Sequence, residues 1–162
     1  MKNFTKIFFA VLIVSLFFFV GCSKKDSNVL TVGATPEPHA AMLKLVEDNL
    51  AEEGITLKVI DFTDYVTPNE ALEGGQLDAN FFQHLPYMDS FNAERGYHLV
   101  NAGGIHIEPV ALYSKKISSV DEIKDGATIA IPNDPTNEGR ALLLLQSAGL
   151  IKLDENAGIT AT

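Results

Sequence analysis

Residues 78–87 read DANFFQHLPY, and this stretch decides the class of fold. The first six residues, Asp78–Gln83, include two phenylalanines and predict a β-strand. Proline is tolerated in the first turn of a helix, so Pro86 predicts a helix that runs to Arg95 and is followed by Gly96. A strand that leads directly into a helix is the repeating unit of α/β proteins.

The same alternation of strand and helix continues on both sides of this stretch. Val29–Ala34 predicts the first strand, and the apolar residues of 55–59 alternate with polar ones as in a half-buried strand. Further strands are predicted over Tyr97–Ala102, Ile105–Tyr113 and Ala127–Ile131, and helices over Ala40–Glu53, Asn69–Leu72, Ser119–Glu122 and Thr136–Ala148.

This order of elements predicts an α/β sandwich with a mostly parallel sheet. Ligands of such sheets bind beyond the carboxyl ends of the strands. We therefore expect the functional residues in the loops that follow Ala34, Phe62, Gln83 and Ile131.

The start of the chain has the pattern of a secretory signal. Two lysines precede Ile7–Val20, which is apolar except for Ser15 and is shorter than a membrane-spanning helix. The next residues complete FVGC (residues 19–22), which resembles a bacterial lipobox. We expect a signal peptide over residues 1–21, lipidation of Cys22, and a flexible tether over residues 22–28. An ordinary cleaved signal with an incidental cysteine is the alternative.

The charge of the chain excludes several classes of partner. Without residues 1–21 the chain holds 10 basic and 21 acidic side chains, a net charge of about −11. Nucleic acids and anionic lipid surfaces both require a basic face. We therefore expect neither as a partner of the protein surface, and expect membrane contact only through the lipid anchor.

Aromatic residues and one histidine gather in the loops that should carry function. Tyr65 follows one predicted strand, and Phe82, His84 and Tyr87 follow or end the next. Sulfur packs favourably against ring edges, so such a group would suit an apolar, polarizable ligand side chain. The alternative for Phe81 and Phe82 is that they fill the core of the sheet.

Arg140 is the single most informative residue. We place it in the first turn of the helix predicted over Thr136–Ala148, where the exposed N–H groups and the helix dipole favour an anion. A guanidinium beside them would bind a carboxylate through two parallel hydrogen bonds. The alternative is a surface ion pair of Arg140 with Glu138 or Asp134.

Three motifs carry a family resemblance. Residues 64–69 (DYVTPN), 78–87 and 131–142 (IPNDPTNEGRAL) resemble the methionine-binding (NlpA) lipoprotein family. The resemblance implies a two-lobed periplasmic-binding-protein fold of the second type, with the ligand held between the lobes. Residues 29–108 would then form the first lobe, and residues 109–162 the beginning of the second.

The resemblance also implies roles for individual residues. The side-chain pocket would be lined by Tyr65, Phe82, His84 and Tyr87, Arg140 would bind the α-carboxylate, and Asn137 would belong to the same site. The ligand would be L-methionine, or D-methionine or a related amino acid. The protein would stand on the extracytoplasmic face of a membrane and deliver this ligand to an ABC permease and its ATPase. Since residues 22–162 supply only part of a two-lobed site, we expect them to bind methionine weakly or not at all on their own.

The sequence bears on four other functions. A zinc-binding lipoprotein could use His39, His84, His98 or His106, but none of these has a recognisable ligand spacing, so no metal site or cofactor is expected. The sequence has no nucleophile elbow and no phosphate loop, so no enzyme is expected. A binding protein for another small apolar amino acid or a dipeptide, and a surface antigen or scaffold without a ligand, stay open.

Overall fold

A parallel three-stranded sheet organises the part of the chain that the computed structural model describes, residues 28–158. Strands β1 (Val29–Ala34), β2 (Thr56–Asp61) and β3 (Ala79–Phe81) lie in the order β2-β1-β3. The register pairs Val29 with Thr56 and Val32 with Ala79. The predicted α/β class with a parallel sheet is confirmed.

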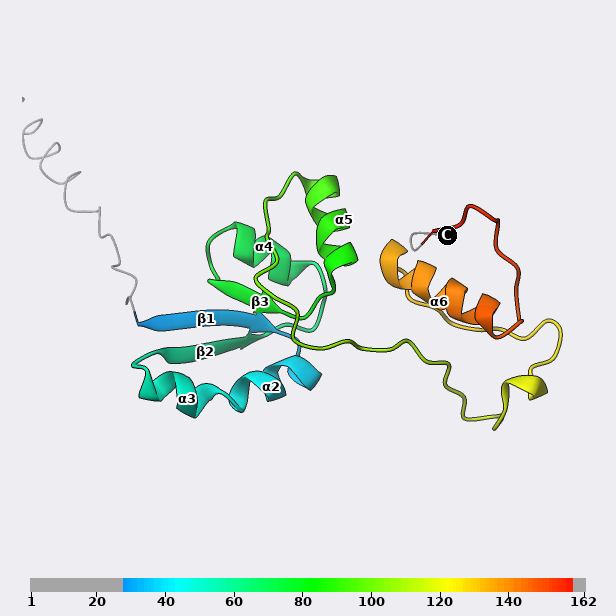
Figure 1. Cartoon of the computed structure of the whole chain (residues 1–162), viewed down its shortest axis with the longest axis horizontal. Helices are drawn as coiled ribbons and strands as arrows, with labels where there is room; N and C mark the ends of the chain where they lie inside the picture. Colours follow the sequence, from blue (N-terminus) through cyan, green and yellow to red (C-terminus); the bar gives the residue numbers. More distant parts are fainter. Residues whose placement is uncertain (1–27, 159–162) are drawn as a thin grey trace, which may run out of the picture.

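Helices cover both faces of this sheet. In Figure 1, α2 and α3 lie on one side, and α4 and α5 on the other. The helical segments are, in chain order, η2 (Pro36–Ala40), α2 (Ala41–Lys44), α3 (Glu47–Glu52), α4 (Thr67–Glu73), α5 (Leu85–Arg95), η3 (Val120–Glu122) and α6 (Pro135–Ser147). Within residues 28–158, none of them has the length and apolar character needed to cross a membrane.

The core lies between the sheet and its helices. Its buried apolar residues include Val32 and Ala34 of β1, Leu57 of β2, and Met88 and Phe91 of α5. The packing is close enough to require a glycine in β1: a Cβ at Gly33 would lie 2.7 Å from Leu77 Cδ1 and 2.8 Å from Phe62 Cε2.

The prediction of a single helix over Ala40–Glu53 is wrong, because the helix is interrupted between α2 and α3. Val46 adopts φ −107° and ψ 0°, outside the helical region. Leu45 and Val46 are 79 % and 45 % exposed, so they do not serve the core as their spacing suggested. A β-branched residue loses side-chain freedom in a helix, which favours the break at this position.

The strands predicted over Tyr97–Ala102, Ile105–Tyr113 and Ala127–Ile131 are also wrong. The chain from residue 97 to residue 119 is an irregular, extended segment (Figure 1). A strand forms only beside a partner that accepts its hydrogen bonds, and within residues 28–158 no segment pairs with these. Ile105, Ile107 and Tyr113 are consequently 72 %, 90 % and 87 % exposed. The lobe boundary after residue 108 stays a prediction.

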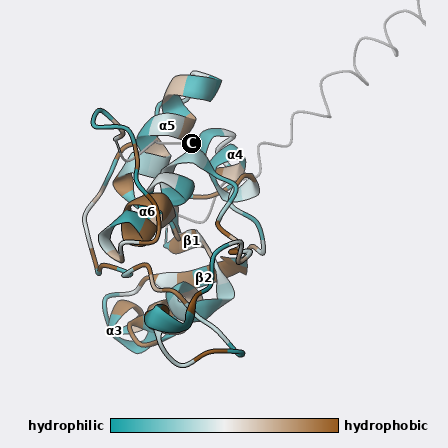
Figure 2. Cartoon of the chain, turned by 90° about the vertical axis from the view of Figure 1, so that its right-hand side faces the viewer, coloured by the Kyte–Doolittle hydropathy of each residue, from teal (hydrophilic) through white to brown (hydrophobic). Residues whose placement is uncertain are grey.

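The last helix agrees with its prediction within one residue. Asp134 caps its start by accepting a hydrogen bond from the Asn137 backbone N–H at 2.9 Å, and Pro135 is its first residue. Apolar residues mark α6 in brown in Figure 2, with Ala141 and Leu145 buried. The helix predicted over Ser119–Glu122 begins with a capping box at Ser119, although this helix, η3, is a single 3₁₀ turn.

Three amide side chains form a partly buried network where β3 ends. Asn69, on α4, is completely buried. Its Nδ2 donates to Gln83 Oε1 at 2.9 Å, and its Oδ1 accepts from Gln83 Nε2 at 2.8 Å and from Asn80 Nδ2 at 2.9 Å. This amide network ties α4 to β3 and to the turn that leads into α5. A buried polar group is stable only when its hydrogen bonds are satisfied, so each member depends on the others.

We predict that Asn69→Ala lowers the free energy of unfolding by about 1–3 kcal/mol, because it leaves the amides of Asn80 and Gln83 without their buried partner. Urea unfolding followed by circular dichroism measures the change. Asn49→Ala is the matched control, since Asn49 is exposed on α3, and it should stay within about 0.5 kcal/mol of the parent. Equal stability of Asn69→Ala and the parent would contradict this role of the network.

Candidate functional site

An open cleft of about 910 Å³ lies between the loops that follow β2 and β3, the segment 98–108, and the start of α6. The six residues that the sequence singled out come from three separate segments, and all of them line this cleft: Tyr65, Phe82, His84, Tyr87, Asn137 and Arg140. The structure therefore brings the predicted site residues together. Their roles toward a ligand stay predictions.

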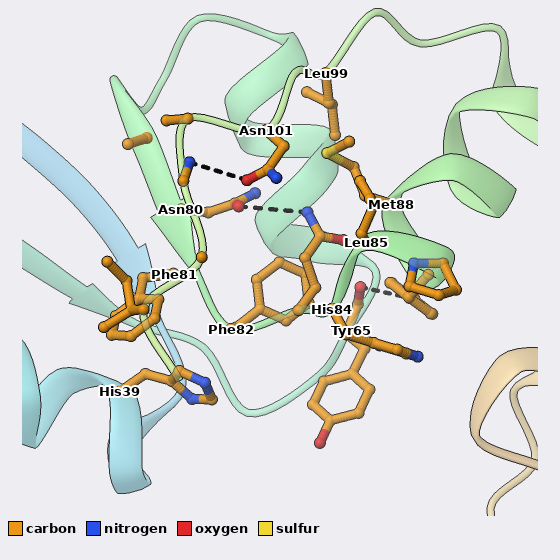
Figure 3. A pocket seen from close by; sticks show the side chains of 18 of the residues that line it. His39, Tyr65, Asn80, Phe81, Phe82, His84, Leu85, Met88, Leu99 and Asn101 are labelled. Carbon is orange, nitrogen blue, oxygen red and sulfur yellow. Dashed lines mark hydrogen bonds between the residues drawn. The ribbon is translucent and has the colours of Figure 1, made fainter. Parts of the chain in front are cut away.

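Three aromatic rings form one wall of the cleft. The ring centroids of Tyr65 and Phe82 lie 5.9 Å apart, those of Tyr65 and Tyr87 6.1 Å, and those of Phe82 and Tyr87 6.3 Å. Figure 3 shows the side chains of Tyr65 and Phe82. Phe82 is 7 % exposed, whereas Tyr65 is 50 % exposed. Phe82 thus serves both the core and the wall, and Tyr65 offers an open ring face.

Hydrogen bonds fix the position of Tyr65. The Tyr87 hydroxyl donates to the Tyr65 carbonyl oxygen at 2.9 Å. One residue earlier, Asp64 Oδ1 accepts from the backbone N–H groups of Val66 and Thr67 at 2.8 and 2.7 Å. These hydrogen bonds, chiefly the one from Thr67, hold the pKa of Asp64 below its ordinary value. A charged carboxylate therefore fastens the turn that presents Tyr65.

His84 lies at the N-cap of α5 and faces the cleft. Burial, and then the positive charge of Arg140, lower the pKa of this imidazole, while Asp134 opposes the shift. The ring is therefore neutral at pH 7. Its Nε2 atom is buried and has no hydrogen-bond partner among the described residues. Such an atom is costly unless a bound group satisfies it, which makes His84 a candidate ligand contact.

Arg140 is held by neutral groups only. Its Nη1 donates to Asn137 Oδ1 at 2.9 Å and its Nη2 to the Glu108 carbonyl oxygen at 2.6 Å. Arg140 is the sixth residue of α6, so it lies in the second turn of the helix, and its predicted placement in the first turn was wrong. In the described chain it forms no ion pair, with Glu138, Asp134 or any other carboxylate. Its positive charge is therefore available to an anion.

Asn137 connects the helix cap to Arg140. Its amide nitrogen donates to Asp134 Oδ2 at 3.0 Å, while its oxygen accepts from Arg140. Burial tends to raise the pKa of Asp134, but hydrogen bonds from Asn137 and Thr136 outweigh this and hold the pKa below its ordinary value. In this arrangement Asn137 orients the guanidinium, and it still lines the cleft.

Two features of the site were not predicted from the sequence. The amide network of Asn69, Asn80 and Gln83 supports the turn that carries Phe82 and His84. A second cluster, His39 with His106 and Glu108, assembles on the cleft wall from two distant segments. The only sequence signal for this cluster was the presence of histidines in the loops near strand ends.

Comparison with known proteins supports the lipoprotein family that the sequence motifs resemble. The NlpA lipoprotein family matches residues 30–162. The D-methionine-binding lipoprotein MetQ of Salmonella typhimurium (strain LT2) is 47 % identical over 143 residues, covering 88 % of this chain and 53 % of that protein.

Solved structures agree in fold. Lipoprotein Tp32 from Treponema pallidum has a TM-score of 0.80 at 44 % identity, covering 83 % of this chain and 56 % of that one. The pheromone cOB1 precursor/lipoprotein of the YaeC family from Enterococcus faecalis V583 has a TM-score of 0.76 at 49 % identity, with the same two shares.

The chain belongs to the NlpA lipoprotein family. The resemblance stated from its motifs is confirmed, and so is the α/β fold class of these lipoproteins. The chain spans about half the length of the curated relatives that it matches.

We predict that Arg140→Gln raises the pKa of His84, because it removes a positive charge that disfavours the imidazolium. An NMR titration of the His84 ring protons measures the shift. Arg95→Gln is the matched control: it removes an arginine of α5 that lies over the Phe91 ring, and should leave the His84 titration unchanged. An unchanged His84 midpoint in Arg140→Gln would mean that the two walls of the cleft do not face each other in solution.

Proposed function

We propose that this chain forms the ligand-binding region of a lipid-anchored solute-binding protein that delivers methionine to an ABC importer. The printed names of relatives support the ligand, since one is a D-methionine-binding lipoprotein. A solved relative is likewise described as the methionine-binding protein MetQ, at 46 % identity and a TM-score of 0.80. The geometry of the cleft supplies the physical support.

The observation that carries the proposal is the uncompensated guanidinium of Arg140. Two neutral acceptors, Asn137 Oδ1 and the Glu108 carbonyl, orient it without neutralising it. A guanidinium has five N–H donors, so several stay available for the α-carboxylate of an amino acid. An ion pair formed in a cleft is worth more than one on an open surface, because water screens it less.

The aromatic wall supports an apolar, polarizable side chain at the other end of the ligand. Thioether sulfur gains about 0.3–1.5 kcal/mol from contact with an aromatic ring. Tyr65, Phe82 and Tyr87 offer such rings within one cluster. The neutral His84, with its unpartnered Nε2, adds one polar contact that can distinguish among side chains.

The partners and the anchor are further parts of the proposal. The predicted lipidation site, Cys22, lies outside the described residues. The lipoprotein names of the relatives support an anchor on the extracytoplasmic face of a membrane. From there the protein would hand its ligand to a membrane permease that is driven by an ATPase, and it would carry out no chemical reaction itself.

We predict that Arg140→Ala weakens methionine binding at least tenfold, and Arg140→Lys nearly as much, because an ammonium cannot form two parallel bonds to a carboxylate. Isothermal titration with L-methionine and D-methionine, in a version extended to the length of the relatives, measures the loss. Arg95→Ala, at a surface arginine of α5, is the control and should bind like the parent.

His84→Ala provides a second arm of the same experiment. It should cost less affinity than Arg140→Ala and should change the ratio of affinities for methionine and leucine, because it alters the side-chain end of the cleft. If Arg140→Ala keeps the parent affinity and the circular dichroism of the fold, the carboxylate is held elsewhere and the proposal fails. If the parent releases no heat with any amino acid or dipeptide, a scaffold lipoprotein is the better description.

For the anchor, we predict that Cys22→Ser moves the protein from the detergent-rich phase to the aqueous phase, or leaves it unprocessed, because serine cannot receive a thioether-linked lipid. Phase partitioning and intact-mass measurement detect both outcomes. A Cys22→Ser protein that is cleaved at the same bond and stays equally membrane-bound would refute the anchor.

A further inference from the structure

Two histidines and one glutamate meet on the cleft wall, although the sequence gave no recognisable ligand spacing. His39 comes from η2, after the carboxyl end of β1, and His106 and Glu108 come from the extended segment 97–119. His106 Nε2 lies 3.2 Å from Glu108 Oε1, and His39 Nε2 lies 3.8 Å from the same oxygen. One ligand atom from each residue lies within 4.8 Å of the other two.

The neighbours of His39 fix the orientation of its ring. Its Nδ1 lies 2.6 Å from Thr35 Oγ1, and its side chain is only 8 % exposed. Phe81 packs edge-on against the His39 ring, with centroids 4.7 Å apart, and packs in the same manner against His106 at 5.6 Å (Figure 3 shows His39 beside Phe81). When Nδ1 carries the proton and donates a hydrogen bond to Thr35 Oγ1, Nε2 keeps a free lone pair 3.8 Å from Glu108 Oε1.

His39 thus has the arrangement that is usual for metal-binding histidines. A ligating imidazole almost always donates its other N–H to an oxygen, which fixes the tautomer. A tetrahedral zinc with bonds of about 2.0–2.1 Å places its ligand atoms about 3.3 Å apart. The observed separations of 3.2 and 3.8 Å lie near this value. Two nitrogens and one carboxylate favour Zn²⁺ over Mg²⁺ or Ca²⁺, which prefer oxygen ligands.

We propose that His39, His106 and Glu108 bind one Zn²⁺ ion on the cleft wall, with water as the remaining ligand. The ion would join η2, which packs beside the sheet, to the segment that leads to α6. The backbone of that segment is already held at Glu108, whose carbonyl oxygen accepts from Arg140. Neither this site nor its ligand set depends on the methionine proposal.

The structure offers a matched pair without the third ligand. His98 Nδ1 lies 3.2 Å from Glu73 Oε1, the same distance as in the pair of His106 and Glu108. The His98 side chain is 87 % exposed and belongs to no three-residue cluster in the described chain. A histidine and glutamate in contact therefore serve as a control for ordinary surface hydrogen bonding.

The test is a zinc titration of the whole chain, purified in detergent, in competition with a chromophoric chelator. Every variant carries Cys22→Ser, so that the thiol cannot bind the metal. We expect one Zn²⁺ per chain, an affinity at least tenfold lower in His106→Ala and in Glu108→Gln, and no change in His98→Ala. Glu108→Gln preserves the size and shape of the side chain, so a loss of zinc affinity in this variant cannot be attributed to misfolding.

Cobalt provides a second readout. Co²⁺ in the parent should give the visible absorption of a four-coordinate ion, and His106→Ala should abolish it. The proposal is overturned if binding is not saturable at one ion per chain. It is also overturned if His98→Ala loses as much affinity as His106→Ala, or if Glu108→Gln binds as tightly as the parent.

Discussion

The hydrogen bonds of one buried side chain, Asn69, hold the cleft in place. Asn69 has no exposed surface, and its amide is shared between Asn80 and Gln83. These hydrogen bonds therefore fasten the turn between β3 and α5 to α4. Phe82 and His84 lie in that turn, so the same hydrogen bonds hold the aromatic wall and the unpartnered imidazole in position. A site residue is useful only when its support restricts it to one orientation.

The opposite wall depends on electrostatics that are arranged around neutral acceptors. Asp134 is satisfied by the cap of α6, so it does not neutralise Arg140. Asn137 lies between Asp134 and Arg140, and its neutral amide orients the guanidinium by accepting a hydrogen bond from it. The result is a cation that faces a neutral imidazole and three aromatic rings. Such a cleft favours a molecule with an anionic end and an apolar end, as free amino acids with long side chains have.

The sequence predicted those elements whose signals are local. Pro86 and Gly96 mark the ends of α5, and α6 begins within one residue of its predicted start. Prediction from the sequence failed where an element depends on a partner that is distant along the chain. Ile105–Tyr113 has the composition of a strand, but no strand lies beside it in the described chain. The contact of His39 with His106 could not be predicted for the same reason, since their separation in the sequence shows no periodicity. Positions after strand ends or near a helix start singled out Tyr65, His84 and Arg140, whereas the inclusion of Asn137 and the roles of all these residues toward methionine came from motif resemblance.

The extended segment 97–119 is the first part of the covalent link between α5 and α6 (Figure 1). A ligand that touches both walls is bound only by molecules in which the walls face each other. Its apparent affinity is therefore the intrinsic affinity multiplied by the population of that arrangement. A tenfold change in this population corresponds to about 1.4 kcal/mol. Substitutions in the link can thus tune affinity without touching the ligand, and selection can adjust the protein to a scarce or an abundant solute at positions far from the cleft.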